Sequence, residues 1–186
     1  MTALTMKKHI LSIIIITFVL FSSLSTTSQA TELTLNNTPT QVYFSPGGGC
    51  TEAIISQIDK AKSEILVQAY SFTSAPIAKA LLNAHKRGIK VEAILDKSQR
   101  KEKYTSATFL LNSGIPTYID DRHAIAHNKI MIIDKETVVT GSFNFTKAAE
   151  EKNAENLLII RNKELAKIYM GNWYKHKDHS EDYKGR

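Results

Sequence analysis

Cysteine is almost absent from this 186-residue chain, in which Cys50 is the single thiol. One thiol cannot form an internal disulfide, and it excludes the cysteine clusters that bind zinc. Cys50 follows the run PGGG, and we interpret it as a small buried residue near the start of a helix. We also find no clustered carboxylates and no Cys/His cluster in the sequence, so we expect no metal site.

A hydrophobic run long enough to cross a membrane is also absent. The apolar stretch Ile10 to Phe21 is shorter than the roughly 20 residues that a membrane span needs. It follows Lys7 and Lys8, and a polar segment leads from it to the small-x-small pattern SQA at Ala30. We therefore expect residues 1–30 to be a signal peptide cleaved after Ala30, with an uncleaved anchor as the alternative. The protein is then exported, to a periplasm or out of the cell.

The composition is that of one globular domain with a real core, because 42% of the residues are hydrophobic and 23% are charged. The formal net charge is +6, and removal of Lys7 and Lys8 with the signal peptide lowers it to +4. A basic balance suggests an anionic partner such as nucleic acid or a membrane surface. Charge alone is weak evidence, since many basic domains bind nothing anionic.

Strands and helices alternate in the first half of the chain, which indicates βαβ units. A helix follows PGGG, with Thr51 as its cap and an apolar face that includes Ile54 and Ile58. The second half adds a hairpin with a turn at residues 134–136, then one more strand and a closing helix. The expected strands are 41–45, 64–72, 89–95, 115–119, 129–134, 137–142 and 154–161, and other helices are expected over 75–88, 101–112 and 162–177. We predict one α/β domain over 31–176, with a mixed sheet flanked by helices, and a polar tail over 177–186.

His127 and Lys129 stand at the mouth of an apolar strand, in the stretch AHNKIMIID. Residues two apart in a strand share a face, so these side chains point the same way, while Asp134 points the other way and closes the turn. A histidine beside a permanent positive charge is a poor metal ligand but suits an anionic phosphate. Lysine neutralises a phosphate oxygen, and imidazole attacks phosphorus or transfers a proton.

Further candidates follow in GSFNF and NAENLLII. Gly141 permits a close approach of the backbone, and Ser142 and Asn144 can donate hydrogen bonds to phosphate oxygens. Glu155 opens the next apolar strand, where a carboxylate can hold a histidine ring in one tautomer. The alternative for Ser142 and Asn144 is that they are only turn residues, and the alternative for Glu155 is that it is only a surface charge.

The pattern His127-x-Lys129-x4-Asp134-x6-Gly141-Ser142 resembles the HxKxxxxD motif of the phospholipase D superfamily. The resemblance covers nearly the whole chain after residue 30, and residues 53–96 look like the front half of that family's small bacterial endonucleases.

The resemblance implies a phospholipase D-like fold and a reaction through a covalent phosphohistidine, without a metal or another cofactor. It implies that a histidine attacks the phosphodiester, a second histidine protonates the leaving oxygen, and water releases the product. The catalytic set carried over is His127, Lys129, Asn144, Glu155, Ser142 and Asp134, and the substrate-binding set is Lys129, Ser142, Asn144 and Gly141. For Asp134 a purely local role at the turn stays open.

This chemistry needs two motif histidines, and the sequence contains one complete motif. His176-Lys177-Asp178 spells H-K-D contiguously in the expected polar tail, and we interpret it as a chance match. The second histidine is therefore expected from a second copy of the chain, in a two-fold homodimer with the active site at the interface.

Three functions follow from these observations. The first is an exported, metal-independent endonuclease of low sequence specificity, and the second is a phospholipase D acting on phospholipid head groups. The motif is common to both, because both substrates are phosphodiesters. The third is a non-catalytic nucleic-acid-binding protein that keeps the fold.

Two features outside the motif stay open. Tyr70 is either a base-stacking or a packing residue. Either a groove for a polyanion or a solvated charged face is formed by Arg87, Lys97, Arg100, Lys101 and Lys103.

Overall fold

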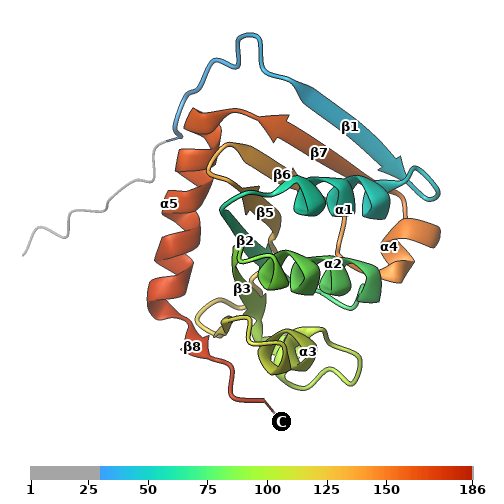
Figure 1. Cartoon of the computed structure of the whole chain (residues 1–186), viewed down its shortest axis with the longest axis vertical. Coiled ribbons are helices and arrows are strands. Elements are labelled where there is room, and N and C mark those ends of the chain that lie inside the picture. The colour runs from blue at the N-terminus through green and yellow to red at the C-terminus, as the bar shows by residue number, and fades with distance from the viewer. Residues whose placement is uncertain (1–29, 186) are drawn as a thin grey trace, which may run out of the picture. The chain divides into compact units, whose positions relative to one another are not determined.

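The computed structural model describes residues 30–185, and all its helices and strands lie in the unit Leu33–Arg186 (Figure 1). The signal peptide predicted over residues 1–30 lies outside the described residues, apart from Ala30. Within the described part of the chain, no helix combines the length and hydrophobicity that a membrane span requires.

Eight strands form a single mixed sheet in the order β1-β7-β6-β5-β2-β3-β4-β8. The pairs β2–β3 and β3–β4 are parallel, as βαβ units require, and the other neighbours are antiparallel. The strands are β1 (Thr40–Ser45), β2 (Glu64–Ala69), β3 (Lys90–Asp96), β4 (Thr117–Asp120), β5 (Lys129–Ile133), β6 (Thr137–Gly141), β7 (Glu155–Arg161) and β8 (Glu181–Asp182). The predicted single α/β domain with a mixed sheet is confirmed.

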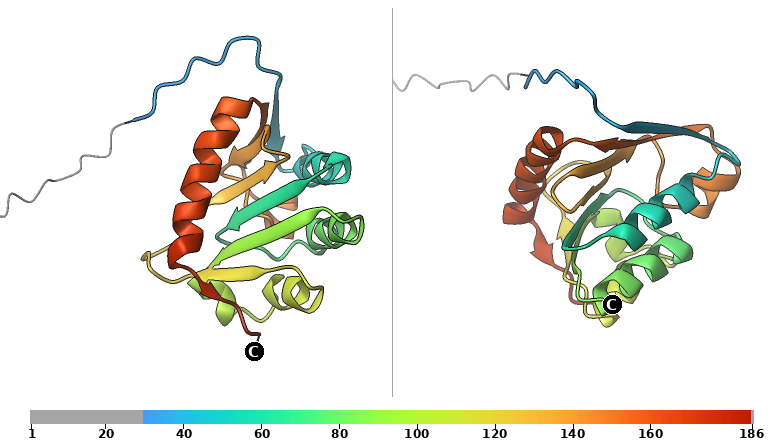
Figure 2. Two further views of the ribbon diagram at one scale, coloured as in Figure 1. Left: turned by 60° about the vertical axis from the view of Figure 1, so that its left-hand side comes forward. Right: turned by 45° about the horizontal axis from the view of Figure 1, so that its top comes forward.

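Helices cover both faces of this sheet (Figure 2). The long helix α5 lies on one face, and α1 and α2 lie side by side on the other. The helices are α1 (Cys50–Lys60), α2 (Ala75–Lys86), α3 (Ala107–Asn112), α4 (Lys147–Glu151) and α5 (Lys163–His179), with a 3₁₀ turn η1 at Lys97–Arg100.

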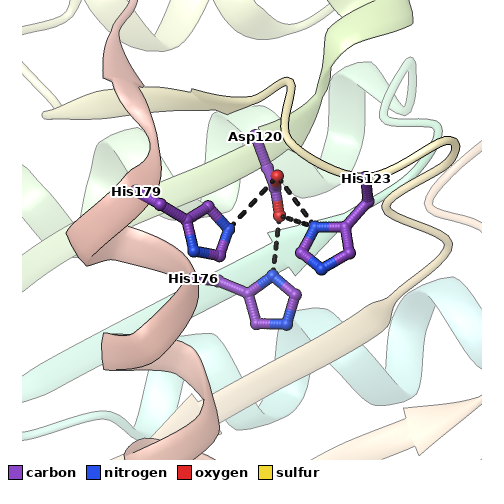
Figure 3. A group of neighbouring side chains, drawn as sticks. All are labelled: Asp120, His123, His176 and His179. Carbon is purple, nitrogen blue, oxygen red and sulfur yellow. Dashed lines mark hydrogen bonds and ion pairs between the residues drawn. The ribbon is translucent and has the colours of Figure 1, made fainter. Parts of the chain in front are cut away.

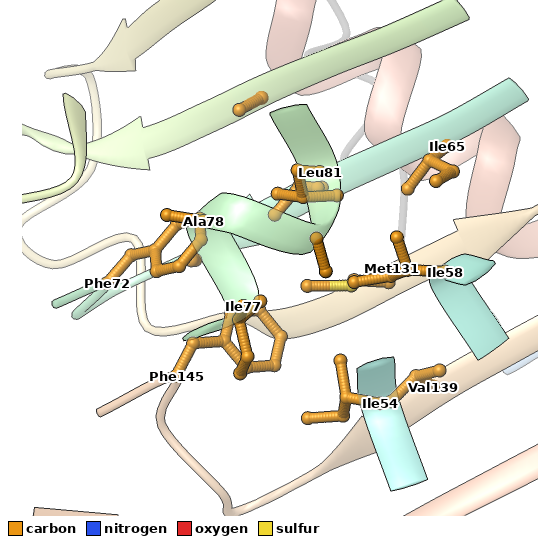
Figure 4. Close-up of a cluster of buried hydrophobic side chains, with 14 of the residues drawn as sticks. Ile54, Ile58, Ile65, Phe72, Ile77, Ala78, Leu81, Met131, Val139 and Phe145 are labelled. Carbon is orange, nitrogen blue, oxygen red and sulfur yellow. The ribbon is translucent and has the colours of Figure 1, made fainter. Parts of the chain in front are cut away.

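The central strands are buried on both faces, which explains why their sequences are nearly continuous apolar runs. In β2, Ile65 and Val67 join the core beneath α1 and α2, while Leu66 points to the opposite face beneath α5. Figure 4 shows the larger core, in which Ile54 and Ile58 of α1 meet side chains of α2, β2, β5 and β6. This packing fixes the register of the strands and hence the positions of their ends.

The hairpin of β5 and β6 is confirmed, with Asp134 and Lys135 both in the left-handed region (φ 53° and 59°). The cap predicted at Thr51 is wrong, because α1 begins at Cys50 and its N-cap is Gly49, two residues earlier. The carboxylate of Glu150 instead accepts hydrogen bonds from the backbone N–H groups of Gly49 (3.1 Å) and Thr51 (2.7 Å). A residue about 100 positions away in the chain therefore performs the capping, and no local pattern reveals it.

The helix predicted over 101–112 is also too long, because α3 starts only at Ala107. Residues 101–104 are exposed and offer no apolar face to the core. The Thr105 hydroxyl accepts from the Ala107 N–H (3.1 Å) and donates to Gln99 Oε1 (2.9 Å), which sets the start of the helix.

The polar tail predicted over 177–186 is largely folded. Helix α5 continues to His179, and β8 then pairs with β4 at the edge of the sheet. Lys177 forms an ion pair with Glu92, and the buried Tyr183 shares a hydrogen bond of 2.8 Å with the hydroxyl of Thr108. The domain therefore extends past the predicted boundary at residue 176.

Candidate active site

Four strand ends meet at one edge of the sheet. The pairings β2–β5 and β6–β7 place Ala69 opposite Lys129 and Gly141 opposite Leu157. The antiparallel pairing of β5 and β6 then brings Lys129 and Gly141 to the same edge. Glu155 begins β7 at that edge as well, so residues from distant parts of the sequence converge there.

His127 and Lys129 contact the same aromatic ring, as expected for side chains on one face. The imidazole of His127 lies 4.7 Å from the ring of Tyr70, and the Lys129 ammonium lies 5.0 Å from the centre of that ring. Lys129 Nζ also donates to the backbone carbonyl of His127 (3.0 Å). Tyr70 thus orients both motif side chains, a role the sequence left undecided between stacking and packing.

Lys129 is buried, with 6% of its surface exposed, whereas His127 is exposed to solvent. Burial lowers the pKa of Lys129, and the negative charges of Glu155 and Asp96 oppose that shift. An ammonium in this setting has few water molecules around it, so it attracts a phosphate strongly.

The loop that carries His127 is held by backbone contacts. Asp96, at the end of β3, accepts the Ala126 N–H (2.7 Å) and the Ser98 N–H (2.9 Å), and it is 2% exposed. The N–H of Tyr70 donates to the carbonyl of Asn128 (2.8 Å). Asp96 is a positioning residue that the sequence analysis missed, although an aspartate closing an apolar strand was a signal for it.

Gly141 and Ser142 sit where β6 meets β7. Gly141 has φ 150°, and a Cβ at this position would lie 2.2 Å from the backbone oxygen of Asn156, so only glycine fits. The Ser142 hydroxyl accepts the Asn156 N–H (3.0 Å), which leaves its own proton free to donate to a substrate.

Asn144 and Glu155 complete the predicted set. The side-chain oxygen of Asn144 is buried and has no hydrogen-bond partner among the described residues. Glu155 Oε1 accepts from Asn153 Nδ2 (3.2 Å). The expected hydrogen bond from His127 to Glu155 is absent from residues 30–185 of the single chain.

Asp134, which the motif resemblance placed in the catalytic set, lies apart from these side chains. It lies at the opposite end of β5, where its carboxylate accepts from the backbone N–H groups of Lys62, Ser63 and Glu64 and from the Ser63 hydroxyl, at 2.7–3.2 Å. Burial alone would raise its pKa, but these donors lower it below the ordinary value. The alternative of a local structural role is therefore the one the geometry supports.

The basic side chains that the sequence left open between a polyanion groove and a solvated face make separate contacts. Arg87 donates to the carbonyls of Ile58 and Asp59, and Lys97 donates to the carbonyl of His123. Arg100 pairs with Glu181, and Lys97, Lys101 and Lys103 are all exposed.

Comparison with known proteins identifies the family. A family model described as the cardiolipin synthase, phospholipase D-like domain matches residues 54–175. The chain belongs to the phospholipase D superfamily. It is a phosphodiesterase of this superfamily, and the family assignment made from the motif is confirmed.

Individual members of the superfamily resemble the chain over most of its length. A phospholipase D from Rickettsia conorii is 47% identical over 143 residues, which are 77% of this chain and 72% of that protein. The crystal structure of Nuc, a phospholipase D family member from Salmonella typhimurium, superposes with a TM-score of 0.77 at 40% identity, over 80% of this chain and 99% of Nuc. NucT from Helicobacter pylori gives a TM-score of 0.74 at 25% identity, over 78% and 99%.

A second cluster of polar side chains lies away from the His127 site. Asp120, His123, His176 and His179 converge, with their potential ligand atoms all within 4.8 Å of one another. The expectation that the chain has no clustered His site is therefore wrong. The sequence analysis interpreted His176-Lys177-Asp178 as a chance match, although the spacing His176-x-x-His179 at a helix end was a signal for such a cluster.

Proposed function

We propose that this protein is an exported, metal-independent endonuclease that cleaves nucleic acid through a phosphohistidine intermediate. The observation that carries the proposal is the single set of His127, Lys129 and Asn144 in a chain that matches 99% of Nuc's length. The sequence contains one complete motif, as the small single-motif endonucleases of this superfamily do.

In the proposed reaction, a ring nitrogen of His127 attacks the phosphorus of a phosphodiester. A P–N bond forms and the P–O bond to the leaving alcohol breaks, with a second histidine donating the proton. Water then cleaves the P–N bond, which leaves a phosphate monoester and regenerates the imidazole. Lys129, Ser142 and Asn144 hold the phosphate oxygens and stabilise the charge that develops on them.

The second histidine is proposed to be His127 of another copy of the chain. His127 is exposed, and the side chains it contacts in its own chain are Tyr70 and Lys129 rather than a second imidazole. A two-fold axis beside the exposed imidazole would bring two such rings to one phosphate. The side-chain oxygen of Asn144, which has no hydrogen-bond partner among the described residues, would then find one across the interface.

Phospholipid is the second candidate substrate, because a Rickettsia relative with 47% identity is named phospholipase D. The basic charge of the chain suits both polyanions and anionic membrane surfaces. The proposed export rests on the signal peptide expected over residues 1–30, and an exported enzyme would act in a periplasm or outside the cell.

The substrates are distinguished by incubating the purified protein with plasmid DNA, RNA and phosphatidylcholine vesicles, each in EDTA at 25 °C. Cleavage of nucleic acid without release of choline supports the endonuclease, and the reverse result supports the phospholipase. Binding of DNA without cleavage of any substrate points to a non-catalytic protein and contradicts the proposal.

The dimer is tested by refolding wild-type protein together with His127→Ala in equal amounts. If each active site needs two copies of His127, only dimers of two wild-type chains are active. The activity of the mixture is then about a quarter of that of the same total amount of wild-type protein, whereas independent sites leave about half. His85→Ala is the matched control, because His85 lies on α2 away from the site and its mixture should keep full activity.

A further inference from the structure

Three imidazoles gather around one buried carboxylate at the end of α5 (Figure 3). Asp120 is the last residue of β4, and His123 follows in the loop toward His127. His176 and His179 are three apart in the last turn of α5, so they lie on one face of the helix. The four side chains thus come from a strand, the loop that follows it, and a helix in which His176 lies 56 positions after Asp120.

All three rings aim a nitrogen at the carboxylate of Asp120. Nδ1 of His123 lies 3.0 Å from Oδ1, Nδ1 of His176 lies 2.6 Å from Oδ2, and Nε2 of His179 lies 3.3 Å from Oδ1 (Figure 3). The ring centres are separated by 4.8–5.3 Å. This is the convergence of nitrogen and oxygen atoms that a small cation requires.

Hydrogen bonding and charge pairing account poorly for this arrangement. Asp120 is fully buried and carries at most one negative charge, so it balances only one imidazolium, and further protonation would place like charges about 5 Å apart. Nε2 of His179 is buried and lies 3.3 Å from Oδ1 of Asp120, but it makes no hydrogen bond to any residue that the structure describes. A buried ring nitrogen without a hydrogen bond is available as a lone-pair donor.

We propose that Asp120, His123, His176 and His179 form a structural site for a divalent transition-metal ion, with zinc as the best match. Three imidazole nitrogens and one carboxylate oxygen are borderline ligands that zinc prefers, whereas magnesium and calcium prefer oxygen alone. Four protein ligands close the tetrahedral shell, which is typical of structural rather than catalytic zinc.

The site would fasten the C-terminal end of α5 to the loop that leads into the catalytic strand. His123 precedes His127 by four residues, and its carbonyl already accepts a hydrogen bond from Lys97 (2.9 Å). His123 has 44% of its side chain exposed, compared with 15% for His176 and 19% for His179, which leaves a path for the ion to enter. The metal would stabilise the fold and leave the phosphohistidine chemistry unchanged.

The test is zinc binding by the whole chain, purified without a polyhistidine tag and stripped with a chelator. Zinc is titrated against a chromogenic competitor, and Tm is measured with and without zinc. We expect about one tightly bound zinc per chain. At zinc concentrations near 100 times Kd, Tm should rise by about 5–10 °C.

The variants His123→Ala and His176→Ala should weaken zinc binding by at least about tenfold and lose most of the Tm rise. Replacement of a residue that only hydrogen-bonds to a metal ligand already costs about tenfold in affinity, and these residues are proposed to be ligands themselves. His85→Ala, which removes a half-buried histidine elsewhere, should behave like the wild type. His123→Ala keeps the test decisive if His176→Ala fails to fold, because His123 lies on an exposed loop. Equal zinc binding by wild type and His123→Ala, or the absence of any zinc-dependent Tm rise, overturns the proposal.

Discussion

Asp134 has either a structural or a catalytic role in the motif, and its replacement by alanine distinguishes the two. We expect the variant to lose stability and to keep its catalytic activity. Its carboxylate accepts from three backbone N–H groups and one hydroxyl, with the shortest distance, 2.7 Å, to the Ser63 N–H. Hydrogen bonds to a charged group are worth about 1.5–3 kcal/mol each, but the donors of Lys62 and Ser63 are exposed and water can replace their partner. The loss of these hydrogen bonds should then lower the free energy of unfolding by only about 1–2 kcal/mol, mostly because the buried N–H of Glu64 loses its acceptor.

The backbone adds a second cost. Asp134 has φ 53°, a conformation that costs alanine roughly 1–2 kcal/mol but that asparagine tolerates. Asp134→Ala should therefore lower the free energy of unfolding by about 3 kcal/mol and Tm by about 6–12 °C, and Asp134→Asn by about half as much.

Thermal unfolding and kcat/KM at 25 °C provide the assay. Both variants should keep kcat/KM within about threefold of wild type, since Asp134 lies at the far end of β5 from His127. A loss of activity of 100-fold or more with an unchanged Tm would refute the structural reading.

The pH dependence gives an independent check on Asp134. Its pKa is held below the ordinary value of 3.8, so its contribution to stability is complete above that value and is lost as the pH falls through the lower folded pKa. The stability difference between wild type and Asp134→Asn should shrink below about pH 4. A difference that stays constant down to pH 2 contradicts the assignment.

Three further predictions concern the site and its supports. Gly141→Ala should cost at least about 3 kcal/mol and abolish activity, because its Cβ would meet the Asn156 oxygen at 2.2 Å; denaturant unfolding with a wild-type midpoint contradicts this. Lys129→Met should lower kcat/KM by about 100-fold or more with little loss of Tm. Because burial lowers the pKa of Lys129, the activity of the wild type should decline at a lower alkaline pH than an ordinary lysine predicts. Glu150→Gln should destabilise the protein by about 1 kcal/mol through α1, measured by urea unfolding, and an unchanged midpoint argues against the cap.

The sequence predicted the sheet well, and it predicted that His127 and Lys129 share one face, because both depend on local patterns. Apolar runs of four to seven residues marked the strands, and the alternation along β5 placed His127 and Lys129 on one side. The βαβ order and the motif spacing then brought Gly141 and Glu155 to the same edge.

What the sequence did not reveal depends on contacts between distant residues. Glu150 caps a helix that begins 100 residues earlier, and Asp96 holds the loop before His127 across the sheet. His176 acquires its partner only when α5 returns across β4. Such pairs leave no periodic signal, because each needs a fold before its members meet.

The most direct test of the account is to trap the covalent intermediate. The enzyme is mixed with a short oligonucleotide, quenched in alkali within a turnover, digested and examined by mass spectrometry. The account predicts an acid-labile nucleotidyl adduct on the peptide that contains His127, and its absence from His127→Ala, which should be folded and inactive. Turnover by His127→Ala at a rate near wild type, without any adduct at this position, would contradict it.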